Sequence, residues 1–338
     1  MAFSASPGKV GVMNNEWECV VVGGGAAGLS AALVLGRARR RTLVIDAGEQ
    51  SNRAAHGIGG LLGHDGRPPA ELYADGRREL AEYPSVQVVD GLVTGATAHD
   101  GPTFRLELAD GSVHHAQRIL LAGGMHYEAP DIPGLNDHWG RSVFHCPFCH
   151  GWEARDQALA VLADGDRAMH MALMLRGWTD DIVVVTNGPS GLDDDQYRAL
   201  ADAGVQVDER KIGEFASREG ALAAIVFADC DELKREGALV ASALRQRTDL
   251  ATQLGVRIAP PGPVVVDAVV VDQFGRTSVP GVFAAGDVCA QMPQVASAIA
   301  AGSAAAAAIV QSLLHDQFGL PVMPWPVFDQ QEESDVRN

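Results

Sequence analysis

The sequence has little positive charge and few aromatic residues. Lys and Arg total 26 against 43 Asp and Glu among 338 residues, which gives a net charge of -17, and aromatic residues make up 6%. Such a surface repels a phosphate backbone and anionic lipids, so neither nucleic acid nor an anionic membrane surface is an expected partner. Hydrophobic residues reach 47%, which excludes a disordered chain. At about 100–200 residues per domain, the length suits two compact domains.

No segment has the character of an export signal or a membrane span. Residues 1–16 lack a basic start followed by an apolar run, so we expect a flexible arm and a cytoplasmic protein. Two stretches, 19–36 and 294–314, carry no charge over a length that could cross a bilayer. The first contains four glycines near its start and is typical of a strand, turn and helix. The second is mostly Ala, Gly and Ser, which gain little from lipid, so a buried helix is expected.

The five cysteines are an odd number without an export signal, which argues against a structural disulfide framework. Cys19, Cys230 and Cys289 stand alone and are expected to be small buried hydrophobes. Cys146 and Cys149 differ, because they form a CxxC.

The order of apolar runs and turns predicts an α/β fold with two nucleotide-binding units. A strand at 18–22, a glycine turn, a helix at 29–35 and a strand at 42–46 make a βαβ unit. A second unit begins with the strand at 158–162. Further expected elements are strands at 86–93, 103–108, 112–115, 118–122, 181–185, 264–271 and 281–287, and helices at 167–176 and 294–314.

Pro-rich crossings at 129–134 and 259–263 indicate domain boundaries. We therefore expect two Rossmann-like domains, each of three layers (ββα), one inserted in the other. The outer domain comprises residues 17–128 and 261–322, the central domain comprises residues 129–260, and a tail follows at 323–338.

The first glycine loop predicts a dinucleotide site in the outer domain. Gly23 allows a tight turn, Gly25 lets the backbone approach a pyrophosphate, and Gly28 permits close packing of the helix on the strand. The helix N-terminus adds free N–H groups and partial positive charge. Asp46, at the end of the next strand, can accept both ribose hydroxyls. The alternative is a glycine turn that only packs a helix, with a surface aspartate.

The CxxC and its flanking histidines predict redox chemistry. Cysteines spaced in this way at a helix start can form a disulfide, and the helix N-terminus lowers a thiol pKa. His145 and His150 stand beside the two thiols and titrate near neutral pH. A zinc site fails on ligand count, since no second CxxC exists, so no metal is expected.

A second loop, at 163–168 in the central domain, is a damaged copy of the first. It reads Ala-Asp-Gly-Asp-Arg-Ala, so its first glycine is missing, and Asp164 and Asp166 would repel a pyrophosphate. The strand that follows ends without an acid to bind a ribose or arginines to bind a 2′-phosphate. NADPH binding is therefore doubtful, although Arg167 could compensate and leave a weak nicotinamide site.

From residue 17 to residue 314, the chain resembles the thioredoxin-reductase-like family of FAD flavoproteins. The resemblance rests on the first glycine loop, Leu-Ala-Gly-Gly at 121–124, Cys-Pro-Phe-Cys at 146–149 and the run from Gly-Arg-Thr to Gly-Asp at 275–287. It implies FAD in the split outer domain and a homodimer. Further expected FAD contacts are Gly123, Gly286, Asp287, Gln294 and Val295.

By the same resemblance, Cys149 faces the flavin and Cys146 exchanges disulfides with the substrate. His150 follows the second cysteine, where ordinary thioredoxin reductases carry an aspartate. The run Cys-x-x-Cys-His-Gly-x-Glu is similar to small-molecule dithiol oxidases of the gliotoxin and holomycin type. This likeness implies a small-molecule dithiol as substrate, His150 as its base, and dioxygen as the acceptor that becomes hydrogen peroxide.

Three alternatives remain open at this point. The chain could be an NADPH-dependent thioredoxin-disulfide reductase, or a flavin-binding redox sensor without turnover. The central domain could also accept another electron donor, such as ferredoxin. His150 itself could be a helix-start residue bonded to the backbone.

Overall fold

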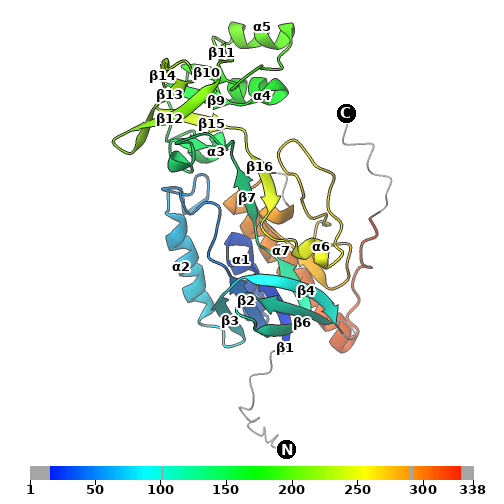
Figure 1. Ribbon diagram of the computed structural model, residues 1–338. Coiled ribbons are helices and arrows are strands. Elements are labelled where there is room, and N and C mark those ends of the chain that lie inside the picture. Colours follow the sequence, from blue (N-terminus) through cyan, green and yellow to red (C-terminus); the bar gives the residue numbers. More distant parts are fainter. Residues whose placement is uncertain (1–15, 100–102, 290–291, 329–338) are drawn as a thin grey trace, which may run out of the picture.

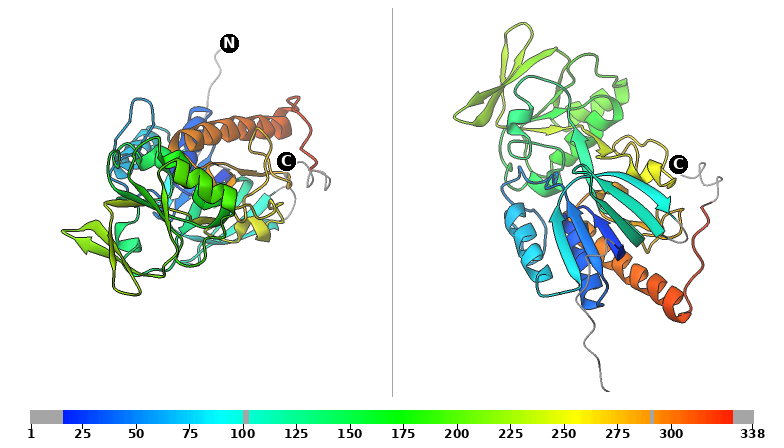
Figure 2. Two further views of the ribbon diagram at one scale, coloured as in Figure 1. Left: turned by 90° about the horizontal axis from the view of Figure 1, so that it is seen from above. Right: turned by 60° about the horizontal axis from the view of Figure 1, so that its bottom comes forward.

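The computed structural model describes residues 16–99, 103–289 and 292–328. The chain forms two lobes, and Figures 1 and 2 show the central part of the chain, in green, making up one of them. The other lobe combines the two ends of the described chain, in blue, cyan and orange. The expected arm at 1–16 lies outside the described residues, except for Glu16, where β1 begins.

The outer lobe is built on a seven-stranded sheet in the order β3-β2-β1-β6-β5-β4, with β17 also paired to β6. The central strands form because their residues are apolar and buried: every residue of β2 is buried. The pairs β1–β2, β2–β3, β1–β6 and β6–β17 are parallel, whereas β4, β5 and the start of β6 form an antiparallel meander. The strands are β1 Glu16–Val22, β2 Thr42–Asp46, β3 Val86–Asp90, β4 Val93–His99, β5 Thr103–Leu108, β6 Val113–Leu121 and β17 Val282–Ala284.

Helices cover one face of this sheet and the meander covers the other, which is the three-layer arrangement expected from the sequence. One core cluster joins the sheet to α1, α2 and α7, and a second joins it to the meander and α6. The helices of this lobe are α1 Ala26–Arg37, α2 Pro69–Leu80, α6 Leu250–Gln253, the short η2 Asp287–Cys289 and α7 Val295–Phe318.

Helix α7 is long and apolar enough, by length and composition, to cross a membrane. Core helices of globular proteins can have the same length and apolar composition. Helix α7 packs against α1 and β17, as a core helix does. Its small residues allow this close packing: a Cβ at Gly302 would lie 2.1 Å from the carbonyl oxygen of Ala27. Figure 2 shows α7, in orange, running along the strands of the outer lobe.

The central lobe repeats the same plan. A parallel sheet in the order β11-β10-β9-β15-β8 lies between α4 and α5 on one face and an antiparallel sheet, β12-β13-β14, on the other. Its elements are η1 Asn136–His138, β8 Val143–Phe144, α3 Pro147–His150, β9 Leu159–Leu162, α4 Gly165–Leu175, β10 Ile182–Val185, α5 Asp194–Asp202, β11 Gln206–Asp208, β12 Ile212–Arg218, β13 Ala221–Phe227, β14 Glu232–Lys234 and β15 Gly237–Val240.

A two-stranded ribbon connects the lobes (Figure 1). It pairs β7, Met125–Glu128, with β16, Ala243–Gln246, in antiparallel register. The chain after β16 packs on the outer sheet, because Leu250, Ala251 and Val256 belong to the core cluster under the meander. The packing therefore puts the return crossing near residue 242, earlier than the expected boundary at 260.

Four strand expectations differ from the structure. The stretch 86–93 is divided between β3, which ends at Asp90, and β4, which begins at Val93, and the expected strand at 281–287 is limited to β17. The stretches 112–115 and 118–122 form one strand, β6, because its first half pairs with β5 and its second half with β17. The apolar stretch 264–271 forms no strand. It makes only isolated bridges, such as Leu244 with Val265, and buries its side chains without a continuous partner.

Candidate active site

A cavity of about 580 Å³ opens where the parallel strands of the outer sheet end. It is lined by the first glycine loop, the segment after β2, the segment after β6, the CxxC region, the residues after β16 and the start of α7. Of the site residues expected from the sequence, those that line it are Gly23, Gly25, Asp46, Gly123, His145, Cys149, His150, Gly286, Asp287, Gln294 and Val295.

The expected residues that do not line the cavity are Gly28 and Cys146. Gly28 has a packing role, since a Cβ there would lie 1.8 Å from the carbonyl oxygen of Gly23. Gly23 has a φ of +109°, which favours glycine. Gly25 is different: a Cβ there would meet only Gln50, at 3.6 Å, so its backbone faces open space. The turn therefore leaves a free backbone surface at the N-terminus of α1.

Asp46 lies at the end of β2, and its side chain is almost fully buried. Its carboxylate accepts hydrogen bonds from the backbone N–H of Gly48 at 3.0 Å, from Gln50 at 3.1 Å and from Arg77. Burial acts to raise the pKa of Asp46, but the bonds from Arg77 and the backbone outweigh it and hold that pKa below its usual range. The residue at the expected ribose position is therefore an oriented carboxylate.

Asp287 lies at the other side of the cavity, directly after β17. Burial raises its pKa to about 6, although the Tyr127 hydroxyl, 3.4 Å away, and the positive charge of Arg247 act in the opposite direction. Burial together with this carboxylate raises the pKa of Tyr127.

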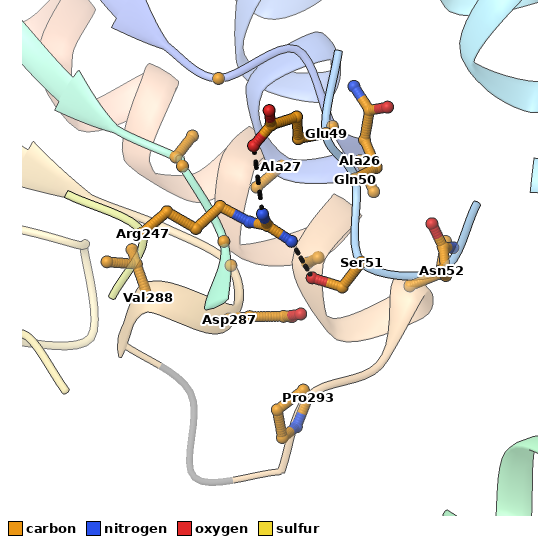
Figure 3. A pocket seen from close by; sticks show the side chains of 18 of the residues that line it. Ala26, Ala27, Glu49, Gln50, Ser51, Asn52, Arg247, Asp287, Val288 and Pro293 are labelled. Carbon is orange, nitrogen blue, oxygen red and sulfur yellow. Dashed lines mark hydrogen bonds and ion pairs between the residues drawn. The ribbon is translucent and has the colours of Figure 1, made fainter. Parts of the chain in front are cut away.

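Sequence reasoning missed a group of polar residues that Figure 3 shows in this cavity. Arg247 extends from the end of β16 and donates a hydrogen bond to the Ser51 hydroxyl at 3.1 Å. It also forms an ion pair with Glu49 at 3.5 Å. No local motif marks Arg247, because its position depends on the pairing of β16 with β7.

The CxxC lies on α3, at the junction of the lobes. Cys146 is the residue before the first turn and Cys149 lies within the helix. The Cys149 thiol acts as hydrogen-bond donor to Cys146, and the backbone N–H groups of Cys149 and Phe148 add to this, so the pKa of Cys146 is lowered despite burial. The pKa of Cys149 is raised by the same bond, by burial and by nearby negative charge. In the reduced pair of the protein without its cofactor, Cys146 is therefore the thiol that ionises first.

Helix α3 is held against the outer lobe. A Cβ at Gly59 would lie 2.6 Å from the carbonyl oxygen of Cys149, so the loop after β2 touches the backbone of the CxxC. Of the two cysteines, Cys149 lines the cavity and Cys146 does not. Both cysteines are free thiols in the structure.

His150 lies in the cavity wall with its ring stacked on Phe144, at a centroid distance of 5.6 Å. Neither ring nitrogen makes a hydrogen bond of normal geometry among the described residues, although the carbonyls of Gly140 and Cys146 lie close enough to act on its pKa. Burial is the largest influence and lowers the pKa of His150. The neutral imidazole is thus available as a base at neutral pH.

His145 lies in the same wall, with its ring centroid 4.3 Å from that of Tyr127 and 6.0 Å from that of Trp139. Burial lowers the pKa of His145 to about 4. It therefore stays neutral through the physiological range and presents an aromatic face to the cavity.

The second glycine loop is held by the chain itself. The N–H of Gly165, at the start of α4, donates to the carbonyl oxygen of Ser190 at 2.7 Å. Arg167 donates to the carbonyl oxygens of Pro263 at 3.0 Å and Ser242 at 3.1 Å. Asp166 accepts a hydrogen bond from Gln196. The Gly165 N–H and the Arg167 guanidinium are thus already bonded within the protein, although a Cβ at Gly165 would meet nothing within 4 Å, so open space does lie beside the loop.

The aromatic residues near the CxxC and in the tail differ in position. Phe148 and Trp152 near the CxxC are exposed, at 56% and 66%, and of the two only Phe148 lines the cavity. Trp325 of the tail does not line the cavity: it packs edge-on against Phe283 and donates to the carbonyl oxygen of Thr277 at 2.7 Å. Among residues 16–99, 103–289 and 292–328, no group of three His, Cys, Asp or Glu side chains is placed to hold a metal ion.

The cavity fits FAD on its own geometry. Its wall runs from Asp46, past the open backbone of Gly25, to Cys149 and His150. Additional room lies beside Gly123 and Gly124, where a Cβ would meet nothing within 4 Å. One wall thus joins an oriented carboxylate, a helix N-terminus and a redox-active cysteine.

Comparisons with known proteins agree with this geometry. The family model described as pyridine nucleotide-disulphide oxidoreductase matches residues 17–302. A curated relative named thioredoxin reductase tcpT, from Claviceps purpurea, is 32% identical over 315 residues, covering 90% of this chain and 97% of the relative.

Two solved structures are similar over almost the whole chain. An oxidoreductase from Agrobacterium tumefaciens is 39% identical with a TM-score of 0.83, covering 88% of this chain and 99% of that one. The structure of HlmI is 35% identical with a TM-score of 0.85, covering 90% of this chain and 94% of that one.

Proposed function

The chain belongs to the pyridine nucleotide-disulphide oxidoreductase family, as an FAD-dependent thiol-disulfide oxidoreductase, and on that premise we propose that it is a dithiol oxidase. It closes a disulfide in a small-molecule dithiol and delivers the two electrons to dioxygen. The observation that carries this proposal is that the second glycine loop is bonded within the chain and flanked by carboxylates. Such a loop is a poor nicotinamide site, so the electrons must come from another donor.

A reductase of this family needs a nicotinamide donor, and the second loop is a poor place to bind one. The Gly165 N–H and the Arg167 guanidinium already bond to carbonyl oxygens of the chain. An incoming pyrophosphate would have to break these bonds and also approach Asp164 and Asp166, whose charges repel it. The alternative in which Arg167 rescues the loop loses its support, because that side chain holds Ser242 and Pro263. Electrons then enter from the dithiol instead.

The reaction needs a relay between the substrate and the cofactor. FAD, when bound, accepts the electron pair from the reduced CxxC and passes it to dioxygen, which becomes hydrogen peroxide. Asp46, the turn at Gly25 and Asp287 would hold this cofactor, with Cys149 beside it.

In the first step a substrate thiolate attacks Cys146 of the Cys146–Cys149 disulfide. A mixed disulfide forms, the Cys146–Cys149 bond breaks, and Cys149 leaves as a thiolate. In the second step His150 takes the proton of the other substrate thiol. That sulfur attacks its partner, the mixed disulfide breaks, and the substrate leaves as a disulfide. The substrate has lost two electrons and two protons. In the net reaction, dioxygen gains these two electrons and two protons and becomes hydrogen peroxide.

The neutral state of His150 suits this role. Its buried ring has a lowered pKa, so it is unprotonated at neutral pH and can accept a proton. Both ring nitrogens are buried and have no hydrogen-bond partner among the described residues, so a substrate thiol that reached one of them would meet no competing partner. A histidine held by two good hydrogen bonds would have favoured a structural role.

Similar proteins that are named thioredoxin reductases favour a second candidate, an NADPH-dependent thioredoxin-disulfide reductase. An oxygen electrode separates the candidates. With dithiothreitol as a probe dithiol, the oxidase consumes one dioxygen and forms one hydrogen peroxide per disulfide over many turnovers. NADPH oxidation that requires thioredoxin disulfide and consumes no dioxygen, together with no oxygen uptake on addition of dithiols, would replace the proposal. Oxidation that stops after one equivalent would indicate a redox sensor.

Two finer features belong to the same proposal. We infer a homodimer, as the family resemblance implies, and a cytoplasmic location, since the net charge of -17 does not suit an anionic membrane surface. Light scattering of the purified protein tests the first.

A further inference from the structure

Arg247 is the one Lys or Arg residue among the described residues that line the cavity. Three carboxylates, those of Asp46, Glu49 and Asp287, line the same cavity. A dinucleotide brings a pyrophosphate with two negative charges into this wall, and three carboxylates would oppose it. A single guanidinium is thus the main side-chain charge that can attract the ligand.

The backbone next to Arg247 is firmly fixed. The N–H of Gln246 donates to the Asp267 carboxylate at 2.9 Å, and Gln246 pairs with Met125 of β7. On the far side of the cavity, Arg247 bonds to Ser51, whose own hydroxyl donates to the carbonyl oxygen of Met125. The ribbon, Arg247 and the loop after β2 therefore form a closed ring of contacts.

The ring forms part of the cavity wall, since Ser51, Gln246 and Arg247 all line the cavity. Figure 3 shows the Arg247 side chain spanning from β16 to Glu49 and Ser51, beside Ala26 and Asp287. Ala26 begins α1, whose N-terminus follows the first glycine turn. Arg247 is 23% exposed in its side chain, against 71% for Glu49. A purely superficial ion pair would leave both partners exposed and contribute little.

We propose that Arg247 is a clasp that retains FAD: its guanidinium bridges the residues after the inserted domain to the loop after β2, and its charge attracts the pyrophosphate. FAD leaves only when this bridge opens. Cofactor retention then depends on the pairing of β16 with β7, because this pairing positions Arg247. It is independent of the proposed dithiol chemistry, because it concerns only the binding of the cofactor.

The rate of FAD release tests the clasp without any activity assay. Holoprotein is diluted, and free flavin is separated by rapid gel filtration and quantified by its fluorescence. For Arg247→Gln we expect release to become about tenfold faster, since a charge-assisted hydrogen bond to a ligand is typically worth about that factor. Arg245→Gln is the matched control: Arg245 lies on the same strand, 2.8 Å from Glu128, and is not among the residues lining the cavity.

Glu49→Gln separates the bridge from the charge. If Arg247 acts as a bridge, loss of its carboxylate partner also speeds release by a few-fold. If only the charge of Arg247 matters, removal of the Glu49 carboxylate, which repels the pyrophosphate, slows FAD release. That result would overturn the bridging role of Arg247. Arg247→Lys keeps the charge but lacks the planar fork, so its release rate should lie between those of the wild type and Arg247→Gln.

Release from Arg247→Gln within twofold of release from Arg245→Gln would overturn the proposal as a whole. The melting temperature of each apoprotein shows whether a variant is folded. If Arg247→Gln fails to fold, the release rates of Arg247→Lys and Glu49→Gln decide the matter. Wild-type rates in both would then refute the clasp.

Discussion

Replacement of His150 by Asn gives the sharpest prediction about the proton transfer. Asn has a similar size and can still bond to the carbonyls near Gly140 and Cys146, but it cannot accept a proton. Burial lowers the pKa of His150, so the wild-type base stays neutral through and below neutral pH. In the variant, the second substrate thiol must lose its proton to water.

The magnitude follows from the thiol. A thiol of ordinary pKa, about 8.5, is roughly 1% ionised at about pH 6.5 and half ionised at about pH 8.5. The turnover number of the variant should therefore fall about tenfold for each pH unit below the thiol pKa. The ratio of wild-type to variant turnover number grows from about twofold at about pH 8.5 to about a hundredfold at about pH 6.5.

Oxygen uptake at saturating dithiothreitol, measured across this pH range, checks the ratio. His56→Asn is a suitable control, because His56 is exposed and close enough to act electrostatically on His150, but does not line the cavity. The control should follow the wild type. A His150→Asn profile that runs parallel to the wild-type profile would refute the assignment of His150 as the base.

The remaining predictions concern the relay, the cofactor and the buried acid. Cys149→Ser should keep FAD, lose turnover and lose the long-wavelength absorbance of a thiolate beside the flavin; an unchanged spectrum in the reduced protein would contradict the placement. Gly25→Ala should fold and lose FAD, whereas Gly28→Ala should destabilise the fold, because its Cβ would lie 1.8 Å from an oxygen; calorimetry and flavin absorbance distinguish the two. The folded pKa of Asp287 is raised to about 6, so the ionised acid destabilises the apoprotein as pH rises through about 4 to 6. Asp287→Asn should therefore raise the free energy of unfolding by up to about 3 kcal/mol at neutral pH and leave it unchanged near pH 4, while FAD is held less tightly. Equal stability of variant and wild type at neutral pH would count against the buried ionised acid.

Local sequence patterns predicted the elements that carry their own signal. The strands β2, 42–46, and β5, 103–108, have the expected bounds, because an apolar run between turn residues is sufficient to define them. The cavity wall also follows from local motifs, since the turn at Gly25 and the CxxC each specify a backbone shape. Each of these patterns lies within a few consecutive residues, so the sequence alone is sufficient to recognise it.

The misses all depend on contacts between distant residues. The stretch 264–271 has the composition of a strand, but no neighbouring strand is placed to pair along it. The three-layer expectation included a second β layer in the central domain, but its strands, β12, β13 and β14, were not located from the sequence. They form against the central core through side chains far apart in sequence. Arg247 enters the cavity only because β16 pairs with β7, a partner more than a hundred residues earlier. Likewise, the bonds that occupy Arg167 depend on how the chain crosses back at Ser242.

An anaerobic titration of the yellow holoprotein tests the central claim most directly. The flavin absorbance is followed on addition of NADPH and, separately, of dithiothreitol. We predict that the dithiol bleaches the flavin and that air restores the colour, while NADPH leaves it unchanged. Rapid bleaching by NADPH would contradict the account, because it would require a nucleotide to bind where Gly165 and Arg167 are already bonded to the chain.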